Sequence, residues 1–104
     1  MKLELTAAAV SDLQSIRSYT LHQWGAAQEQ LYLDGLWEKL QEILVHPEGC
    51  RRREDLFPGC RLAAQGKYVV LFRTQGEVLQ IVRILHSAMD YPKQLDQYRE
   101  PPEL

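Results

Sequence analysis

Apolar and polar positions recur along the N-terminal half of the chain with two different periods. Polar and apolar residues alternate from Lys2 to Leu5, which predicts a short strand. Apolar residues then recur every three or four positions from Ala7 to Trp24, which predicts an amphipathic helix capped by the Thr6 hydroxyl. A second helical pattern runs from Ala26 to about His46, because the proline that follows disfavours helical geometry before it. Only Gly25 separates the two helices, so the pattern predicts an antiparallel helical hairpin.

The C-terminal half changes to the period of strands. Three strands are predicted, at Arg61 to Ala64, Lys67 to Arg73 and Val78 to Leu85. They are separated by Gln65-Gly66 and Thr74-Gln75-Gly76, where glycine supplies the positive φ that tight hairpin turns require. This half therefore predicts a three-stranded antiparallel meander, and the whole chain an α+β fold.

Both faces of the last predicted strand carry apolar residues. Strict alternation assigns its residues to two sets, which are Leu79, Ile81, Arg83 and Leu85 on one face and Val78, Gln80, Val82 and Ile84 on the other. We expect one face to pack on the helices and the other to need a cover. Residues 47–59 hold two prolines, two glycines and a run of charged residues, so we expect a surface connection that buries little. Residues 1–95 should form a single domain and residues 96–104 a loosely ordered polar tail.

Length and composition narrow the class of protein. A chain of 104 residues with 45% hydrophobic and 25% charged residues has the composition of one globular domain. No apolar stretch is long enough to span a membrane and no signal peptide is apparent, so we expect the cytoplasm. A net charge of -2 counts against a dedicated nucleic-acid binder.

Basic residues gather in the middle of the chain, where residues 47–89 hold seven basic and four acidic side chains. The run Arg51-Arg52-Arg53 forms either an anion-binding patch or a solvated loop whose charges are offset by neighbouring acids. Arg61, Arg73 and Arg83 come from three adjacent predicted strands. They either converge to grip a phosphate or pair with acidic helix residues.

Residues able to catalyse a reaction or bind a metal are few. We expect Cys50 and Cys60 to be reduced thiols, with a loop-closing disulfide as the alternative. No motif has metal-ligand or phosphate-loop spacing, so no metal or cofactor is expected. His86 ends the last strand, where it either bonds a backbone carbonyl or acts as a general base. Trp24 and Trp37 lie on apolar helical stripes and are expected in the core.

Several short motifs along the chain occur together in one known family. They are Asp12-Leu13, Tyr19, Trp24-Gly25, Pro47, DLFPGCR at 55–61, YVVLFR at 68–73 and IVRILHSAMD at 81–90. With them the chain resembles the ParE branch of the RelE/ParE toxin superfamily over about residues 2–92. The resemblance implies a β-α-α-β-β-β fold, with the helical hairpin packed on a small, mainly antiparallel sheet. It also implies a toxin of a type II toxin–antitoxin module that a cognate antitoxin wraps.

Two toxin activities occur in this superfamily, and the residues distinguish between them. Members resembling RelE cut mRNA on the ribosome with basic side chains on the sheet and just after its last strand. This chain has Ala63-Ala64 and Ser87-Ala88-Met89 at the corresponding places, which favours the ParE activity, non-enzymatic poisoning of DNA gyrase. The alternative is a ribosome-dependent mRNA interferase. Its altered site would use Arg61, Arg73, Arg83, His86 and Tyr91.

The resemblance also implies two interaction surfaces. The antitoxin is expected to bury an amphipathic helix on the helical hairpin and an extended stretch along the sheet. Its candidate contacts are Leu33, Trp37, Leu40, Tyr68, Val70 and Phe72. The candidate contacts for the target enzyme are Arg51, Arg52 and Arg53 in the basic run and Met89, Asp90, Tyr91 and Leu95 after the last strand.

Overall fold

The computed structural model describes residues 1–95, so the polar tail expected at 96–104 lies outside the described residues. Two long helices, α1 (Ala7–Trp24) and α2 (Ala26–Val45), form the predicted hairpin. The Thr6 hydroxyl accepts a hydrogen bond from the Ala9 N–H (3.0 Å), which confirms Thr6 as the N-cap of α1. Gly25 joins the helices directly with a φ of +88°, a conformation that favours glycine. One glycine therefore makes the whole turn of the hairpin.

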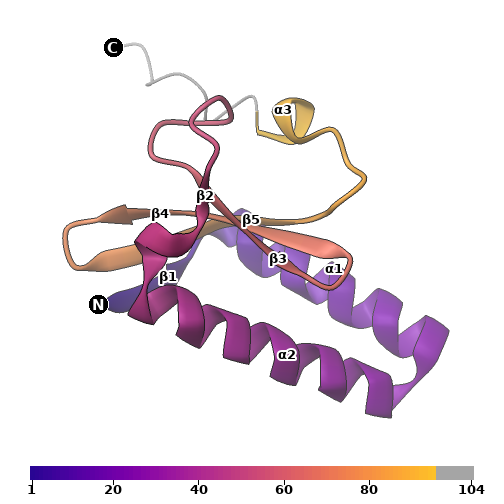
Figure 1. Ribbon diagram of the computed structural model, residues 1–104. Helices are drawn as coiled ribbons and strands as arrows, with labels where there is room; N and C mark the ends of the chain where they lie inside the picture. Colours follow the sequence, from indigo (N-terminus) through magenta and orange to yellow (C-terminus); the bar gives the residue numbers. More distant parts are fainter. Residues whose placement is uncertain (96–104) are drawn as a thin grey trace.

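A five-stranded sheet lies against one side of the hairpin (Figure 1). Its strands are β1 (Lys2–Leu5), β2 (Arg51–Arg52), β3 (Arg61–Gln65), β4 (Tyr68–Gln75) and β5 (Val78–His86). They lie in the order β1-β5-β4-β3-β2, in which β1 runs parallel to β5 and the other neighbours are antiparallel. The predicted α+β fold, with its hairpin on a mainly antiparallel sheet, is confirmed. The two-residue strand β2, the 3₁₀ helix η1 (Pro47–Gly49) and the short helix α3 (Tyr91–Gln94) were not predicted.

The two faces of the sheet have separate cores. The helix-face cluster lies between the sheet and the hairpin, and its buried members are Ala9, Ile16, Leu36, Leu40, Ile43, Ala63, Val70, Phe72, Leu79, Ile81 and Ile84. The outer cluster lies on the opposite face, and its buried members are Leu56, Phe57, Cys60, Val69, Leu71, Val82, Leu85 and Leu95. Figure 1 shows the connection between β2 and β3, together with α3, on the side of the sheet away from the hairpin. The second face therefore finds its cover within the chain itself.

A β-bulge in β5 overturns the predicted division of that strand into two faces. Leu71 of β4 lies opposite Arg83, whereas the next residue, Phe72, lies opposite Ile81, so Val82 is left without a partner on β4. The extra residue shifts the alternation, and Ile84 joins Ile81 on the helix face while Leu85 joins Val82 on the outer face. The assignment of Ile84 and Leu85 by strict alternation was therefore wrong.

The expectation that residues 47–59 bury little was also wrong. The side chains of Leu56 and Phe57 are almost completely buried in the outer cluster. Composition failed here because the charged residues of this segment face the solvent while two adjacent apolar residues cover the sheet. Arg53 and Asp55, for example, form an ion pair at the surface through two hydrogen bonds of 2.9 Å.

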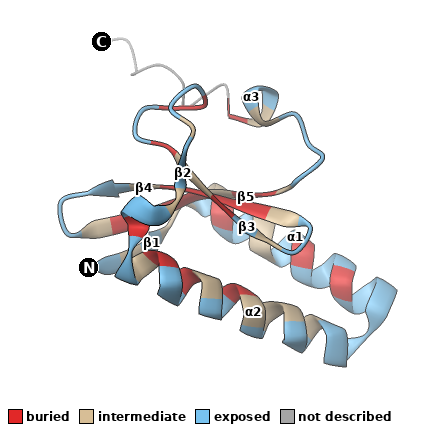
Figure 2. Ribbon diagram, in the orientation of Figure 1, coloured by how far each residue is buried: buried red, intermediate tan, exposed pale blue. Residues whose placement is uncertain are grey.

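The far end of the helical hairpin extends beyond the sheet, and Figure 2 shows it as exposed. Trp24 at this end is 67% exposed, and Trp37 on α2 is 59% exposed, so the expectation that both tryptophans lie in the core was wrong. The apolar stripes of α1 and α2 are wider than the sheet, so the sheet covers only part of each stripe. No helix within residues 1–95 is long and apolar enough to cross a membrane.

Candidate functional site

A groove of about 910 Å³ runs between α1 and the edge of β5. We call it the α1–β5 groove. Among the side chains that line it are Asp12, Ser15, Ile16, Tyr19, Trp24, Tyr32, Lys67, Tyr68, Arg83, Ile84, His86 and Met89. Tyr19, Trp24 and Met89 are large, apolar and exposed, which is unusual for side chains gathered in one depression. This concave, largely aromatic surface is the candidate functional site.

One wall of the groove is an uncovered strand edge. Strand β1 pairs with β5 only as far as Ile81, so the rest of β5 has no strand neighbour on that side within residues 1–95. The bond from the Ser87 N–H to the Lys67 carbonyl (2.8 Å) fixes the alternation of hydrogen bonds between β4 and β5. By this alternation, the backbone groups of Ile84 and His86 point away from β4, toward the open edge.

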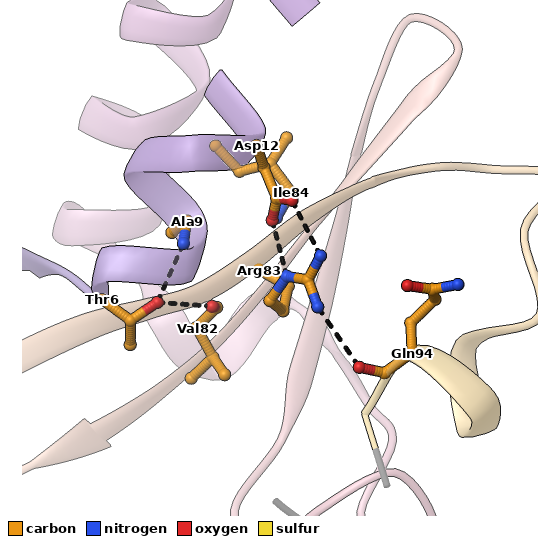
Figure 3. A network of polar contacts seen from close by, with 7 residues as sticks. All are labelled: Thr6, Ala9, Asp12, Val82, Arg83, Ile84 and Gln94. Atoms are coloured by element: carbon orange, nitrogen blue, oxygen red, sulfur yellow. Dashed lines mark hydrogen bonds and ion pairs between the residues drawn. The ribbon is translucent and has the colours of Figure 1, made fainter. Parts of the chain in front are cut away.

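Asp12 of α1 and Arg83 of β5 close part of this edge (Figure 3). The Asp12 carboxylate accepts two hydrogen bonds from the Arg83 guanidinium, at 2.7 and 2.8 Å, and a third from the Ile84 N–H at 3.0 Å. Arg83 also donates to the Gln94 carbonyl at 3.2 Å. The network joins α1, β5 and α3, and both charged side chains are largely buried. Arg83, a candidate nuclease residue, is therefore part of a structural clamp in this conformation.

Three aromatic rings that line the groove contact one another in sequence. Tyr32, Tyr68 and His86 meet edge to face, with ring centroids 5.4 and 5.5 Å apart. The Tyr32 hydroxyl is buried and has no hydrogen-bond partner within residues 1–95, and burial raises the pKa of Tyr32 far above its usual value. Burial also raises the pKa of Tyr68. Nδ1 of His86 accepts a hydrogen bond from the Ala88 N–H (3.0 Å), which places the ring proton of neutral His86 on Nε2. His86 thus caps the strand through an amide N–H, not through the carbonyl that the sequence suggested.

The three sheet arginines do not converge, which contradicts one of the two sequence readings. Arg61 lies on the helix face and donates to the Cys50 carbonyl at 2.9 Å. Arg73 lies on the outer face, where its guanidinium stands 5.8 Å from the ring centroid of Phe57. Arg83 lies at the β5 edge. Successive positions on a strand face opposite ways, and this separates Arg73 from Arg61 in spite of their adjacent strands.

The predicted antitoxin contacts divide into two groups. Leu40, Val70 and Phe72 are buried in the helix-face cluster, so their prediction as surface contacts was wrong. Alternation marks the apolar face of a helix or strand but does not tell whether the chain itself already covers it. The other three candidates, Leu33, Trp37 and Tyr68, are at least partly accessible and stay predictions.

The predicted target contacts divide in the same way. Leu95 is completely buried in the outer cluster, so its prediction as a contact was wrong. Asp90 caps α3 by accepting from the Lys93 N–H, and the Tyr91 hydroxyl donates to the Ser87 carbonyl. Arg53 is bound to Asp55, as described above. The exposed candidates are Arg51, Arg52, Met89 and Asp90.

The two cysteines are free thiols that belong to opposite faces of the sheet. Burial raises the pKa of Cys60 to about 12. The pKa of Cys50 is also raised by burial, although the nearby Arg61 and Lys39 lower it in part. Within residues 1–95, no three histidine, cysteine or acidic side chains are grouped as metal ligands.

Sequence reasoning assigned no role to Tyr32 and did not bring Asp12 and Arg83 together. Asp12 and Arg83 both stand in motifs that the sequence singled out. These motifs do not predict the ion pair, because Asp12 contacts β5 only beyond the point where β1 ends and leaves that edge open. Tyr32 lies on the apolar stripe of α2, and nothing in that stripe distinguishes a groove residue from a core residue.

This fold and groove define a class of small α+β protein, and the comparisons with known proteins identify it. A family model described as the ParE toxin of the type II toxin–antitoxin system parDE matches residues 3–91. The chain therefore belongs to the ParE toxin family of type II toxin–antitoxin systems.

Curated relatives and a solved structure agree with this family. Toxin ParE of Escherichia coli is 36% identical over 87 residues, which are 83% of this chain and 84% of that protein. Toxin ParE1 of Caulobacter vibrioides is 34% identical, with 83% and 88% of the two chains covered. A structure of the chromosomal ParDE system from P. aeruginosa has a similar fold, with a TM-score of 0.71 and 23% identity over 83% of this chain and 95% of that one.

Proposed function

We propose that this toxin stops growth by binding DNA gyrase without cleaving nucleic acid, and that its cognate antitoxin neutralises it by occupying the α1–β5 groove. The separation of Arg61, Arg73 and Arg83 supports the first part of this proposal, which is growth arrest without cleavage of nucleic acid. Metal-free cleavage of RNA needs cations that meet at one phosphate. Arg61 and Arg73 lie on opposite faces of the sheet, and Arg83 is held by Asp12. Binding to a protein target needs an exposed surface and no such convergence.

The groove supports the second part. A partner segment that lies along β5 can hydrogen-bond to the Ile84 carbonyl and the His86 N–H, because the Ile84 N–H already donates to Asp12 and the His86 carbonyl already accepts from the Met89 N–H. Its side chains would cover Tyr19, Trp24 and Met89, which are now in contact with water. A solved relative with this fold is described as a ParDE system. Because gyrase and the antitoxin act inside the bacterial cell, we also place the toxin in the cytoplasm.

A supercoiling assay with purified gyrase tests the proposed target. We expect wild-type toxin to inhibit supercoiling and to trap cleaved DNA, and premixing with the antitoxin to restore full activity. Unimpaired supercoiling with no trapped DNA at a large excess of toxin would reject gyrase as the target.

A pair of matched variants tests the groove. Tyr19→Glu places a charge in the groove, whereas Leu31→Glu places the same charge on an exposed apolar site of α2 that does not line it. We expect Tyr19→Glu to weaken antitoxin binding at least tenfold, measured by calorimetry, and Leu31→Glu to change it little. Equal losses in the two variants would place the antitoxin elsewhere.

The runner-up function is a ribosome-dependent mRNA interferase. One observation favours it, since Lys67, Arg83 and His86 line the same groove and all can carry positive charge. A primer-extension assay on translated mRNA separates the two functions. Codon-specific cuts that disappear in His86→Ala would replace gyrase poisoning with mRNA cleavage.

A further inference from the structure

Two arginines stand directly opposite each other at the sheet edge that lies farthest from β1. Arg52 of the edge strand β2 pairs with Arg61 of β3. The bond from the Arg53 N–H to the Cys60 carbonyl (2.9 Å) makes residues 53 and 60 a hydrogen-bonded pair. Arg52 and Arg61 are therefore a non-hydrogen-bonded pair, the type in which the Cα atoms are only about 4.5 Å apart and side chains are closest.

Like charges at such positions destabilise a sheet unless an anion lies between them. Within residues 1–95, no carboxylate lies within 4.0 Å of either guanidinium. Arg61 has only backbone carbonyls as acceptors, those of Cys50 and Glu48. Within residues 1–95, the chain thus places two cations at facing positions and pairs neither with a carboxylate.

We infer that Arg52 and Arg61 form a docking point for a carboxylate of the target protein. Guanidinium groups from two facing positions can each donate to one oxygen of the same carboxylate. A protein carboxylate suits this place better than a DNA backbone, because Glu48, Glu54 and Asp55 stand in the same segment and would repel a run of phosphates. The overall charge of -2 also disfavours binding to a DNA backbone.

The position of the pair favours the target over the antitoxin. The α1–β5 groove opens at the β5 edge, and the arginine pair lies at the opposite end of the strand order. A partner bound along the groove therefore leaves the pair accessible. The identity of the partner rests on the proposed function, whereas the carboxylate-binding chemistry rests on the arginine pair alone.

A titration of the full chain with an acetylated and amidated Gly-Glu-Gly peptide, which carries a single carboxylate, tests the chemistry by NMR without gyrase. Arg52→Gln removes one member of the pair, and Arg52 is exposed, so the fold should tolerate the change. Arg51→Gln is the matched variant, since it removes the same charge from the other face of the same strand, opposite Leu62. We expect shifts confined to residues 50–53 and 60–62, a roughly tenfold weaker affinity in Arg52→Gln, and at most a twofold change in Arg51→Gln.

Equal losses in the two variants, or none in either, would overturn the docking point. A short DNA duplex that shifts the same signals more strongly than the peptide would replace the carboxylate with a phosphate backbone. In the supercoiling assay, Arg52→Gln should inhibit roughly tenfold less than wild type, while its affinity for the antitoxin stays the same. A loss of antitoxin affinity with unchanged gyrase inhibition would overturn the assignment to the target. If the wild-type toxin leaves gyrase unaffected, the proposed function fails, and the peptide titration still decides the carboxylate site.

Discussion

Both faces of the sheet carry a buried apolar cluster, but different kinds of structure cover them. On the helix face, α1 and α2 supply long regular stripes of apolar side chains. On the outer face, three buried residues of the irregular connection between β2 and β3, Leu56, Phe57 and Cys60, and one residue after α3, Leu95, pack against the strands. A few residues of an irregular segment can therefore form a core on one face of a sheet, provided that each of them is almost completely buried. The comparison shows that a segment need not be a regular helix to bury apolar residues on one face of a sheet.

Truncating one phenylalanine on each face gives the largest expected effect. Phe72→Ala removes a ring of β4 that lies under the helices, and Phe57→Ala removes a ring that the connection itself packs on the outer face. Both rings are buried, so each change should lower the free energy of unfolding by about 3–5 kcal/mol. We expect Phe72→Ala to cost more, because the paired helices collapse less easily into the cavity than a loop does. Urea unfolding measures both, and a larger loss in Phe57→Ala would show that the connection is the more rigid cover.

Asp12→Asn tests the link between the two faces, since Asp12 holds Arg83, which in turn holds the Gln94 carbonyl of the α3 segment. The amide keeps the shape of the side chain and an acceptor for the Ile84 N–H, but it removes the charge opposite Arg83. We expect a loss of about 2 kcal/mol in unfolding free energy, together with faster hydrogen exchange at residues 91–95. Exchange that accelerates in α1 but not in α3 would show that the clamp stabilises only the helix face.

The smallest expected effect is a pH dependence of the free energy of unfolding, which arises from the Cys60 thiol in the outer cluster. The pKa of Cys60 is about 12 in the folded chain, against 9.0 for an unperturbed thiol. Above pH 9 the unfolded chain therefore releases a proton that the folded chain retains, so stability falls as the pH rises, by at most about 1.4 kcal/mol per pH unit. Unfolding measured between pH 8 and pH 10 should show this fall in wild type and much less of it in Cys60→Ala. Identical profiles would mean that the Cys60 thiol ionises as easily in the folded chain as in the unfolded one.

The sequence predicted the parts of the fold that depend on local periodicity. The hairpin, its Thr6 cap, the turn at Gly25 and the three-stranded meander follow from spacing and from single residues with special conformational preferences. Strand β2 escaped prediction because two arginines carry no alternation, and its pairing with β3 arises only in three dimensions.

The candidate site was less predictable because each of its parts depends on where another element stops. The groove exists because β1 ends at Leu5 and leaves the edge of β5 open, and no local pattern reports that length relation. Leu40, Val70 and Leu95 illustrate the same limit from the other direction. Their apolar character was read correctly, but whether such a residue meets a partner or its own chain depends on the tertiary arrangement.

The bulge at Val82 can be recognised in the sequence, because it shifts the alternation of apolar and polar residues along β5 by one position. In an undisturbed strand buried on one face, apolar residues recur at every second position. Here the slip produces two apolar doublets, Ile81-Val82 and Ile84-Leu85, with Arg83 between them. Their spacing of one, three and four positions is the signature normally assigned to a helix. A bulged strand buried on both faces can therefore imitate helical periodicity, and the β-branched residues within the doublets are the local sign that tells the two apart.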